Sequence, residues 1–350
     1  MSNSASKPSG VLYVGIDLGT SRSSVAASNG VRDTLPSYVG YPKDVVARKS
    51  LGKDVLYGQE AIDKRLSLDF YRPLAEGVLR TALDSGKEDK DGHARAARDL
   101  ITECVRRANG RSDELVYAVI GVPAQASMES KDALIAAAKE SIDSVILCSE
   151  PFSVAYGLDL LDDVLVVDIG AGTVDLCRMH GTMPEDADQL TLTTGGDFVD
   201  QQLTERIKQA HPEAQFSLQM VKGIKERFAS VEDQMPQAIV ELPVNGKPQE
   251  FDLHEEIRGA CLEVVPPIVD GLAQLISTFD PEFQDRLKNR VLLAGGGSQI
   301  KGLDVAVERE MRKALGAGKV LRTEESIYAG ANGALKIAND MPDDFWEQLK

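Results

Sequence analysis

The chain is poor in cysteine and in aromatic residues. Its 350 residues include four Cys and one Trp, and Phe, Trp and Tyr together make up 5%. The cysteines, at positions 104, 148, 177 and 261, stand far apart in apolar surroundings and form no C-x-x-C pair. This pattern excludes a disulfide scaffold and a cysteine zinc site. We expect small buried hydrophobic side chains in a reducing compartment.

Clusters of Lys and Arg are also missing, and the formal net charge is −16. A nucleic-acid-binding face needs clustered cations, so we expect no nucleic-acid partner. The first ten residues are polar and lack the apolar core of a signal peptide, and we expect no apolar run of membrane-spanning length. The sequence therefore predicts a cytoplasmic protein with no direct membrane insertion.

Two common nucleotide-binding motifs are absent. Gly295-Gly296-Gly297-Ser298 follows the apolar run 291–294, but Ile300 breaks the G-x-G-x-x-G spacing, and the chain has no G-x-x-x-x-G-K-[ST]. Both absences argue against a Rossmann or a P-loop site. A glycine run between a buried strand and the helix predicted over 303–315 instead suits a flat ligand, such as adenine, lying against the backbone.

What the chain does contain is a glycine-rich segment between two apolar runs. The run 164–167 predicts a buried strand, and Asp168-Ile169-Gly170-Ala171-Gly172-Thr173 follows it. Glycines permit a tight turn in which backbone N–H groups approach phosphate oxygens, and an acid at the strand end can hold Mg²⁺ through water. A plain glycine-rich turn is the alternative for one such segment.

A second copy of this segment lies near the N-terminus. There, Asp17-Leu18-Gly19-Thr20-Ser21 follows a strand predicted over 11–17. The acids Asp17 and Asp168 stand 168 − 17 = 151 positions apart, about one domain length. We therefore expect two similar domains that each bring one aspartate to a nucleotide in a cleft between them.

Length and patterning predict an α/β chain of two ribonuclease-H-like domains, each with a smaller inserted subdomain. We expect a disordered tail over 1–10, domain I over 11–160 plus 322–350 with an insertion at about 35–92, and domain II over 161–321 with an insertion at about 201–265. The segment SGKEDKDG at 85–92 predicts a solvated charged loop. Trp346 predicts a packed terminal anchor, and Gly330 and Gly333 predict a close helix contact.

Glu150 stands where a strand predicted over 144–148 gives way to a helix that begins at Pro151. A carboxylate at this junction can face the cleft, orient an attacking water and accept its proton. A helix-start acid stabilised by the helix dipole explains Glu150 equally well. Gly195-Gly196, before a helix predicted to end near 210, suits an anion or a ribose hydroxyl, and equally a tight turn.

Taken in order, five segments resemble the actin–chaperone–sugar kinase ATPase superfamily over essentially the whole chain after residue 10. They are 15–21 (GIDLGTS), 150–152 (EPF), 168–173 (DIGAGT), 294–298 (AGGGS) and 327–331 (IYAGA). The loops at 36–42 and 71–78 are similar to those of the actin branch rather than of the kinases. Stretches such as 39–45, 119–124 and 345–349 most resemble the bacterial actins that organise magnetosomes.

This resemblance implies a role for each candidate site residue. Asp17 and Asp168 would hold Mg²⁺ through waters, and Glu150 would polarise the attacking water with Thr173 and Asp175 nearby. The implied phosphate ligands are Gly19, Thr20, Ser21, Gly170, Ala171 and Gly172, and the implied ribose and adenine contacts are Gly195, Gly196, Lys225, Glu226, Gly295, Gly296, Gly297 and Ser298. Val174 departs from the pattern because many bacterial actins have a second Thr there, which leaves the role of Thr173 open.

The resemblance also implies that the protein binds ATP or ADP with Mg²⁺, and that water attacks the γ-phosphate in line. It implies cytoplasmic filaments of the protein itself, which would organise magnetosomes into chains with the help of magnetosome-associated adaptor proteins. Alternatives are a plasmid-segregating or other bacterial actin, a membrane-tethered actin, which would need a terminal amphipathic anchor, and a chaperone ATPase, which would need a further domain. A small-molecule kinase would need a separate acid, and we find none on the first-domain side.

Overall fold

The computed structural model of this protein describes residues 10–76, 78–80 and 90–349. The chain divides into two compact units: unit 1 draws on 1–160 and 327–350, and unit 2 spans 161–326. The chain thus re-enters unit 1 at 327, where the sequence suggested 322. Of the tail expected over 1–10, only Gly10 lies within the described residues. Of the charged loop expected over 85–92, residues 85–89 lie outside them, and 90–92 form the start of a helix instead of a loop.

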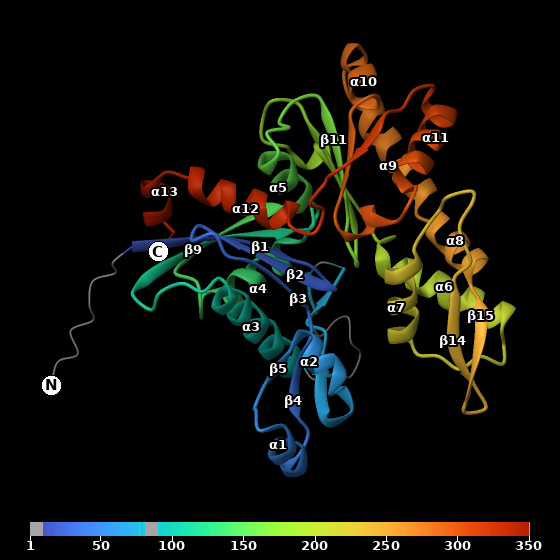
Figure 1. Ribbon diagram of the computed structural model, residues 1–350. Helices are drawn as coiled ribbons and strands as arrows, with labels where there is room; N and C mark the ends of the chain where they lie inside the picture. Colours follow the sequence, from blue (N-terminus) through green and yellow to red (C-terminus); the bar gives the residue numbers. More distant parts are fainter. Residues whose placement is uncertain (1–9, 77, 81–89, 350) are drawn as a thin grey trace. The chain divides into compact units, whose positions relative to one another are not determined.

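Unit 1 is built on a five-stranded sheet with the order β10-β9-β1-β2-β3 (Figure 1). Its strands are β1 (Gly10–Leu18), β2 (Arg22–Ala27), β3 (Arg32–Pro36), β9 (Glu114–Val122) and β10 (Ser144–Ser149). The first three strands are antiparallel and joined by short turns, as Asn29-Gly30 predicts. Strands β9 and β10 run parallel to β1, which therefore lies at the centre of the sheet.

The two faces of β1 meet different helices because side chains alternate along a strand. Outside the inserted subdomain, the helices of this unit are α3 (Lys90–Arg107), α4 (Met128–Ala138), α5 (Glu150–Gly157), α12 (Ala329–Asp340) and α13 (Asp343–Glu347). Leu12, Val14 and Ile16 share an apolar core with α3 and α4. On the opposite face, a Cβ at Gly15 would lie 2.1 Å from the Ala331 carbonyl oxygen of α12. Asp17 lies two residues further on and shares the α12 face.

The C-terminal helices pack as the sequence indicates. A Cβ at Gly333 would lie 1.8 Å from the Ser153 carbonyl oxygen of α5, and Ser153 Oγ donates to the Gly330 carbonyl at 2.7 Å. The predicted close helix contact is therefore confirmed. Trp346 has no exposed surface and stacks on Tyr117 with ring centroids 5.1 Å apart, which confirms the packed terminal anchor.

A small subdomain is inserted after β3. Its elements are β4 (Val39–Pro42), α1 (Val45–Leu51), β5 (Leu56–Tyr57), α2 (Gly58–Asp63), η1 (Arg65–Ser67), β6 (Leu68–Tyr71), β7 (Leu74–Ala75) and β8 (Val78–Leu79). A three-stranded sheet, β5-β4-β6, supports a separate apolar core that includes Tyr38, Leu56 and Leu68. The Tyr38 ring stacks on Phe70 at 5.1 Å. The insertion therefore has a core of its own and can position side chains for the larger sheet.

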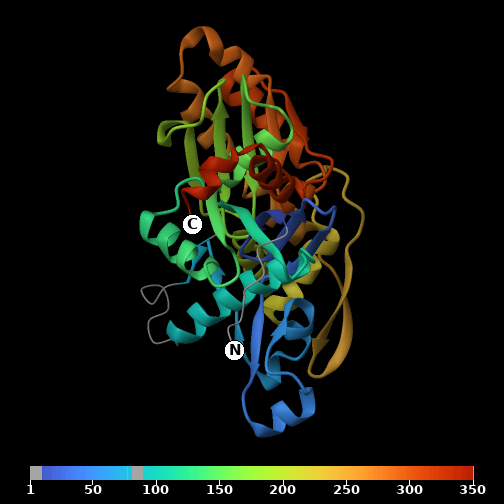
Figure 2. The same cartoon turned by 90° about the vertical axis from the view of Figure 1, so that its left-hand side faces the viewer.

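Unit 2 repeats the plan of unit 1 with the sheet order β13-β12-β11-β16-β17. Its strands are β11 (Val164–Ile169), β12 (Val174–Met179), β13 (Gln189–Leu192), β16 (Val291–Ala294) and β17 (Val320–Arg322), and a separate hairpin is formed by β14 (Ile239–Val244) and β15 (Lys247–Asp252). Three antiparallel strands are again followed by two parallel ones. The hairpin β14–β15, gold in Figures 1 and 2, is long and narrow in both views.

The helices of unit 2 form its main apolar core together with the sheet. They are α6 (Gly196–Ala210), α7 (Leu218–Phe228), α8 (His254–Leu262), α9 (Val265–Ser277), α10 (Pro281–Lys288) and α11 (Leu303–Leu315). Leu165, Val167 and Ile169 of β11 belong to this core. Asp168 alternates with them and therefore points to the other face of the sheet. The two units thus place their aspartates at equivalent positions of equivalent strands.

The stretch 254–277 corrects one expectation. The stretch has 24 residues, and an 18-residue window within it has a mean hydropathy of 1.4. By length and composition alone it could cross a membrane, although the sequence had suggested no run of that length. A 56% share of the window is buried within the described structure, where Ile257, Ile268 and Leu272 join the core of unit 2. Two helices rather than one form this stretch, because α8 ends at Leu262 and α9 begins at Val265. Pro266 stands in the first turn of α9, where a proline is tolerated.

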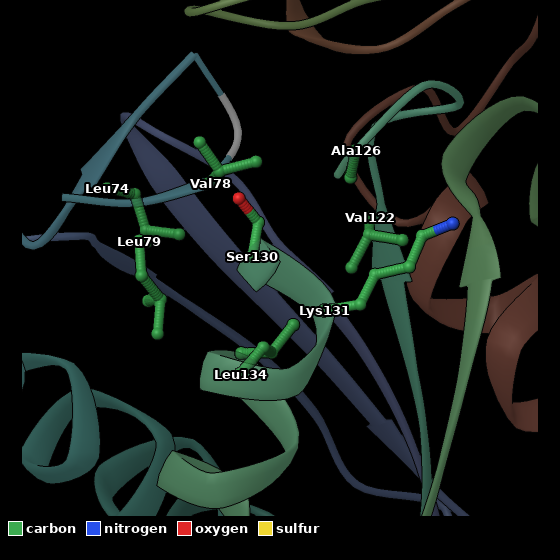
Figure 3. Close-up of a pocket in the computed structure, with 8 residues that line it drawn as sticks. All are labelled: Leu74, Val78, Leu79, Val122, Ala126, Ser130, Lys131 and Leu134. Atoms are coloured by element: carbon green, nitrogen blue, oxygen red, sulfur yellow. The ribbon is translucent and has the colours of Figure 1, made fainter. Parts of the chain in front are cut away.

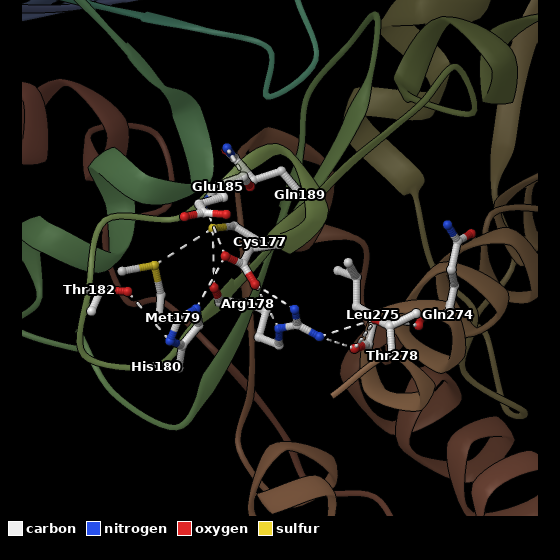
Figure 4. A network of polar contacts seen from close by, with 11 residues as sticks. Cys177, Arg178, Met179, His180, Thr182, Glu185, Gln189, Gln274, Leu275 and Thr278 are labelled. Atoms are coloured by element: carbon white, nitrogen blue, oxygen red, sulfur yellow. Dashed lines mark hydrogen bonds and ion pairs between the residues drawn. The ribbon is translucent and has the colours of Figure 1, made fainter. Parts of the chain in front are cut away.

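A buried ion pair ties β12 to the loop that follows it and to the end of α9 (Figure 4). Arg178 is 5% exposed, contacts Asp188 at 2.5 Å and donates to the Leu275 carbonyl at 2.6 Å. Burial raises the pKa of the Asp188 carboxyl, but hydrogen bonds from the Glu185 amide, Arg178 and His180 outweigh burial, so the pKa lies below its ordinary value. The charged form of Asp188 therefore stabilises the fold.

We expect Arg178→Met to lower the free energy of unfolding by about 3 kcal/mol at neutral pH, because it leaves a buried carboxylate without its partner. Denaturant unfolding measures the loss. Arg286→Met is the control: it removes an exposed ion pair with Asp163 of 3.0 Å and should cost less than about 1 kcal/mol.

The difference between Arg178→Met and the wild type should shrink on acidification. A carboxyl with a lowered folded pKa stabilises the protein above its unfolded pKa, ordinarily 3.8, and loses that contribution as the pH falls through the folded pKa. A difference that is constant from pH 7 to well below 3.8 would contradict the assignment.

Candidate functional site

The first candidate half-site lies at the end of β1 in unit 1. Asp17 pairs across the sheet with Gly121 of β9, and a Cβ at Gly121 would lie 3.3 Å from Glu150 Cγ and 4.0 Å from the Asp17 Cα. Glu150 is the first residue of α5 and is 8% exposed. Glu150 and the backbone of Asp17 therefore both lie close to Gly121, which has no side chain to fill the space beside them.

The sequence analysis missed Gly121. A glycine near the end of an apolar strand, two residues before Pro123, was the available signal, because such glycines mark close approach of a backbone or a ligand. Gly330 on α12 has the same effect on the other side, since a Cβ there would lie 2.8 Å from Asp17 Oδ2. Gly330 thus borders the Asp17 carboxylate, and Gly121 borders the Asp17 backbone.

The electrostatics of this half-site favour a cation. Burial raises the pKa of Asp17 to about 6, and within the part of the chain that the structure describes no hydrogen bond or ion pair reaches its carboxylate. Burial, together with the charges of Glu150 and Asp17, raises the pKa of the Cys148 thiol to about 12. Buried negative charge without a cationic partner is unstable unless a ligand compensates it.

The second candidate half-site lies in unit 2. Asp168 is 7% exposed and is the cross-strand partner of Asp175, so the two carboxylates share one face of the sheet. Asp175 has no exposed surface and accepts a hydrogen bond of 2.6 Å from Thr191 Oγ1. Thr173, 3% exposed, lies in the turn between them. Thr173, Asp175 and Asp168 therefore lie together in this hairpin.

The N-terminus of α6 fixes the turn of this hairpin. The amides of Gly196 and Asp197 donate to the carbonyls of Gly170 and Ala171 at 3.0 and 2.7 Å. A trans peptide is planar and directs its C=O and its N–H to opposite sides. The N–H groups of Ala171 and Gly172 therefore point away from α6. A Cβ at Gly195 would lie 2.7 Å from the Ala171 carbonyl oxygen, so this contact requires the glycine.

Lys225 acts on the same helix end. Its ammonium donates to the Gly196 carbonyl at 2.6 Å and pairs with Asp200 at 2.8 Å. Burial raises the pKa of Asp200, and the Lys225 charge partly opposes this. Lys225 therefore holds the start of α6 against the hairpin, while Glu226 beside it is exposed.

The glycine run after β16 packs directly on Asp168. Gly295 has a φ of 74°, and a Cβ there would lie 2.2 Å from Asp168 Oδ1. A Cβ at Gly297 would lie 2.2 Å from Ile169 Cγ2, whereas one at Gly296 would meet nothing within 4 Å. Ser298, 1% exposed, donates to the Gly295 carbonyl at 2.8 Å. The short helix η3 (Gly296–Gln299) is thus stabilised by its own serine.

The carboxylates of the two half-sites suit Mg²⁺ bound together with a phosphate ligand better than a metal ion bound by protein side chains alone. Among the residues that the structure describes, no group of three or more His, Cys, Asp or Glu could hold a metal ion. Mg²⁺ keeps several waters and is bound through one or two carboxylates together with substrate phosphates. The uncompensated carboxylate of Asp17 and the paired acids of the second hairpin fit this pattern.

The pocket in Figure 3 lies elsewhere in unit 1 and contains no predicted site residue. It is bordered by the β7–β8 hairpin, the end of β9 and the start of α4. Its lining is mostly apolar, with Lys131 and Ser130 as the polar side chains.

Comparison with known proteins gives one family match and close relatives over the whole chain. The family model described as "MreB/Mbl protein" matches residues 12–343. The chain is 39% identical to "Actin-like protein MamK" of Paramagnetospirillum magneticum over 338 residues, 97% of this chain and 95% of the relative. A solved "MamK double helical filament" matches with a TM-score of 0.89 and 38% identity, over 95% of this chain and 99% of that one. A non-polymerising MamK mutant bound to AMPPNP matches with a TM-score of 0.70, 38% identity and the same coverage.

We expect Gly295→Ala to lower the free energy of unfolding by about 2 kcal/mol or more, because alanine is strained at positive φ and its Cβ would collide with Asp168. Gly296→Ala is the matched control, with space around its Cβ and an expected change below about 1 kcal/mol. Thermal unfolding of both variants gives the comparison, and equal losses would contradict the close packing on Asp168.

Proposed function

Because the chain belongs to the MreB/Mbl protein family, we propose that it is an actin-like ATPase that assembles into filaments. The resemblance to bacterial actins, and among them to those that organise magnetosomes, is confirmed by the family match and by the similarity to MamK. The α/β fold of the actin type is likewise confirmed by the match to the MamK filament structure. The observation that carries the function is the repeated aspartate-tipped hairpin in two sheets of the same plan.

In the proposed function, Asp17 and Asp168 would each serve Mg²⁺ through waters, and the N–H groups of each hairpin would bind phosphates of ATP. Bound Mg²⁺ would neutralise charge on the phosphates. Thr20, Ser21 and Gly172 lie in the two turns, where backbone donors can meet phosphate oxygens. AMPPNP in the MamK mutant structure supports ATP as the nucleotide of this chain.

The proposed chemical step needs a base for the attacking water. Glu150 is the candidate, because it is a mostly buried carboxylate that lies beside Asp17 in unit 1. It would orient the water and accept its proton, with Thr173 and Asp175 contributed by the second hairpin. The glycine run 295–297 with Ser298, the pair Gly195-Gly196 and Glu226 would surround the nucleoside. Lys225 would act through its contact with Gly196.

We further propose that the filaments are cytoplasmic and organise magnetosomes, with adaptor proteins as partners. The support is the identity of 39% to MamK of P. magneticum and to MamK of Magnetospirillum gryphiswaldense. A plasmid-segregating or other filament-forming bacterial actin is the alternative, and the residues of the site do not distinguish the two.

Glu150→Ala should keep Mg-ATP binding and reduce phosphate release by a factor on the order of 100 to 10,000, the range for loss of a general base. Single-turnover phosphate release and nucleotide titration measure the two properties. Glu129→Ala, which removes an exposed acid from the first turn of α4, is the control for a helix-dipole role. Wild-type turnover in Glu150→Ala would exclude Glu150 from the mechanism.

Sedimentation with Mg-ATP, with Mg-ADP and without nucleotide tests filament formation. We expect ATP-dependent pelleting, and filaments in electron micrographs of the pellet. ATP hydrolysis without any pelleting would favour an enzyme acting on a small molecule. Pelleting of the wild type in EDTA as efficiently as in Mg-ATP would contradict a nucleotide-controlled assembly.

A further inference from the structure

The first hairpin is held by side chains of the inserted subdomain. Ser37 Oγ donates to the Gly19 carbonyl at 2.6 Å, and Arg72 Nε donates to the Thr20 carbonyl at 2.9 Å. The Ser37 amide also donates to the Ser21 carbonyl at 3.0 Å. Three consecutive carbonyl groups of the turn are therefore bound by two residues that lie 16 to 52 positions further along the chain.

These bonds fix the direction of the backbone donors. Because each trans peptide is planar, a carbonyl bound on one side places the next N–H on the opposite side. The Ser37 contact therefore directs the N–H of Thr20 away from the subdomain, and the Arg72 contact does the same for the N–H of Ser21. Backbone donors that are held in place before a ligand arrives bind it more strongly, because no reorganisation is needed.

The second hairpin has the same pattern at the same positions. Counting from the aspartate, the bound carbonyls are those of the second and third residues in both turns: Gly19 and Thr20 after Asp17, and Gly170 and Ala171 after Asp168. In unit 2 the donors are backbone amides of α6, whereas in unit 1 they are side chains. The two turns thus use different donors to bind carbonyl groups at equivalent positions. We infer that both units need these peptides to be held in the same orientation.

Both side chains are themselves anchored. Ser37 has no exposed surface and its hydroxyl also contacts Ser23 Oγ at 2.9 Å. The Arg72 guanidinium lies 5.9 Å from the centroid of the Tyr38 ring, which belongs to the core of the inserted subdomain. Anchored donors can hold the turn in one conformation.

We propose that Ser37 and Arg72 are positioning residues for nucleotide phosphates, and that the inserted subdomain acts on the nucleotide through them. This inference rests on the proposed function, because the ligand of the first hairpin is taken to be phosphate. It assigns the two residues to the phosphates alone and not to the nucleoside. Removing either donor lets the peptides of Thr20 and Ser21 rotate, which weakens phosphate binding.

The experiment compares Mg-ADP with adenosine, which lacks phosphates, by isothermal titration and competition. Ser37→Ala and Arg72→Leu should each weaken Mg-ADP binding about tenfold, the effect of one lost hydrogen bond near a charged ligand, and change adenosine binding less than about twofold. Arg22→Leu is the control: Arg22 is an exposed cation beside the same turn, it donates to Thr34 Oγ1, and its loss should change neither affinity more than about twofold.

Because the Ser37 side chain is neutral, the Ser37→Ala variant tests the positioning of the turn without removing a charge. If only Arg72→Leu weakens Mg-ADP binding, Arg72 acts as a cation on the phosphates and the proposal is wrong. Equal losses of Mg-ADP and adenosine, or no loss of either, also overturn it. If Ser37→Ala does not fold, Ser37→Cys replaces it, because cysteine keeps the volume and donates weakly. A wild type that does not bind Mg-ADP contradicts the proposed function itself, whereas a binding wild type with unaffected variants contradicts only this inference.

Discussion

The planarity of the peptide bond is the constraint on which both half-sites depend. A turn can present N–H groups to an anion only if the carbonyls of the same peptides are satisfied on the other side. In unit 2 the first amides of α6 bind those carbonyls, and Lys225 holds the helix start in place. In unit 1 no helix begins there, and Ser37 and Arg72 supply the donors instead. One geometric requirement has thus been met by two different sets of residues.

Missing side chains matter as much as those that are present. A Cβ at Gly121, Gly330 or Gly295 would lie within 3.3 Å of Glu150, Asp17 or Asp168, respectively. Each acid therefore occupies space that a glycine of another element leaves open. This arrangement brings carboxylates next to backbone with little water between them, which strengthens any interaction with a bound cation.

The Asp17 carboxylate lowers the stability of the fold unless a cation compensates its charge. Burial raises the pKa of Asp17 to about 6, so its charged form at neutral pH is less stable in the fold than in the unfolded chain. Asp188 is the contrast: hydrogen bonds from Arg178 and its neighbours lower its pKa, and its charge stabilises the fold. A buried acid that has a cationic partner in the protein, such as Asp188, stabilises the fold. A buried acid that has none among the described residues, such as Asp17, is available to a ligand.

Local pattern in the sequence determined much of this protein. The strand ends, the aspartates 17 and 168, the glycine-rich turns and the junction at Glu150 could all be predicted, because apolar runs, turn residues and caps act over a few neighbouring positions. The resemblance to bacterial actins followed from the order of these segments. The apolar stretch 254–277 was not expected to reach spanning length, and composition alone does not distinguish a core helix from a spanning one.

Only the tertiary structure decided which distant residues support the site. Arg72 lies 52 positions from Thr20 along the chain, and Gly121 lies 29 positions before Glu150, yet both pairs are in contact. No periodic pattern links such positions, because a sheet with parallel strands and an inserted subdomain sets their distance through register and packing. Lys225 shows the same limit: the resemblance implied a nucleotide contact, whereas the fold directs its ammonium to Gly196 and Asp200. The sequence determined where the functional atoms stand along the chain, and the fold decided what holds them.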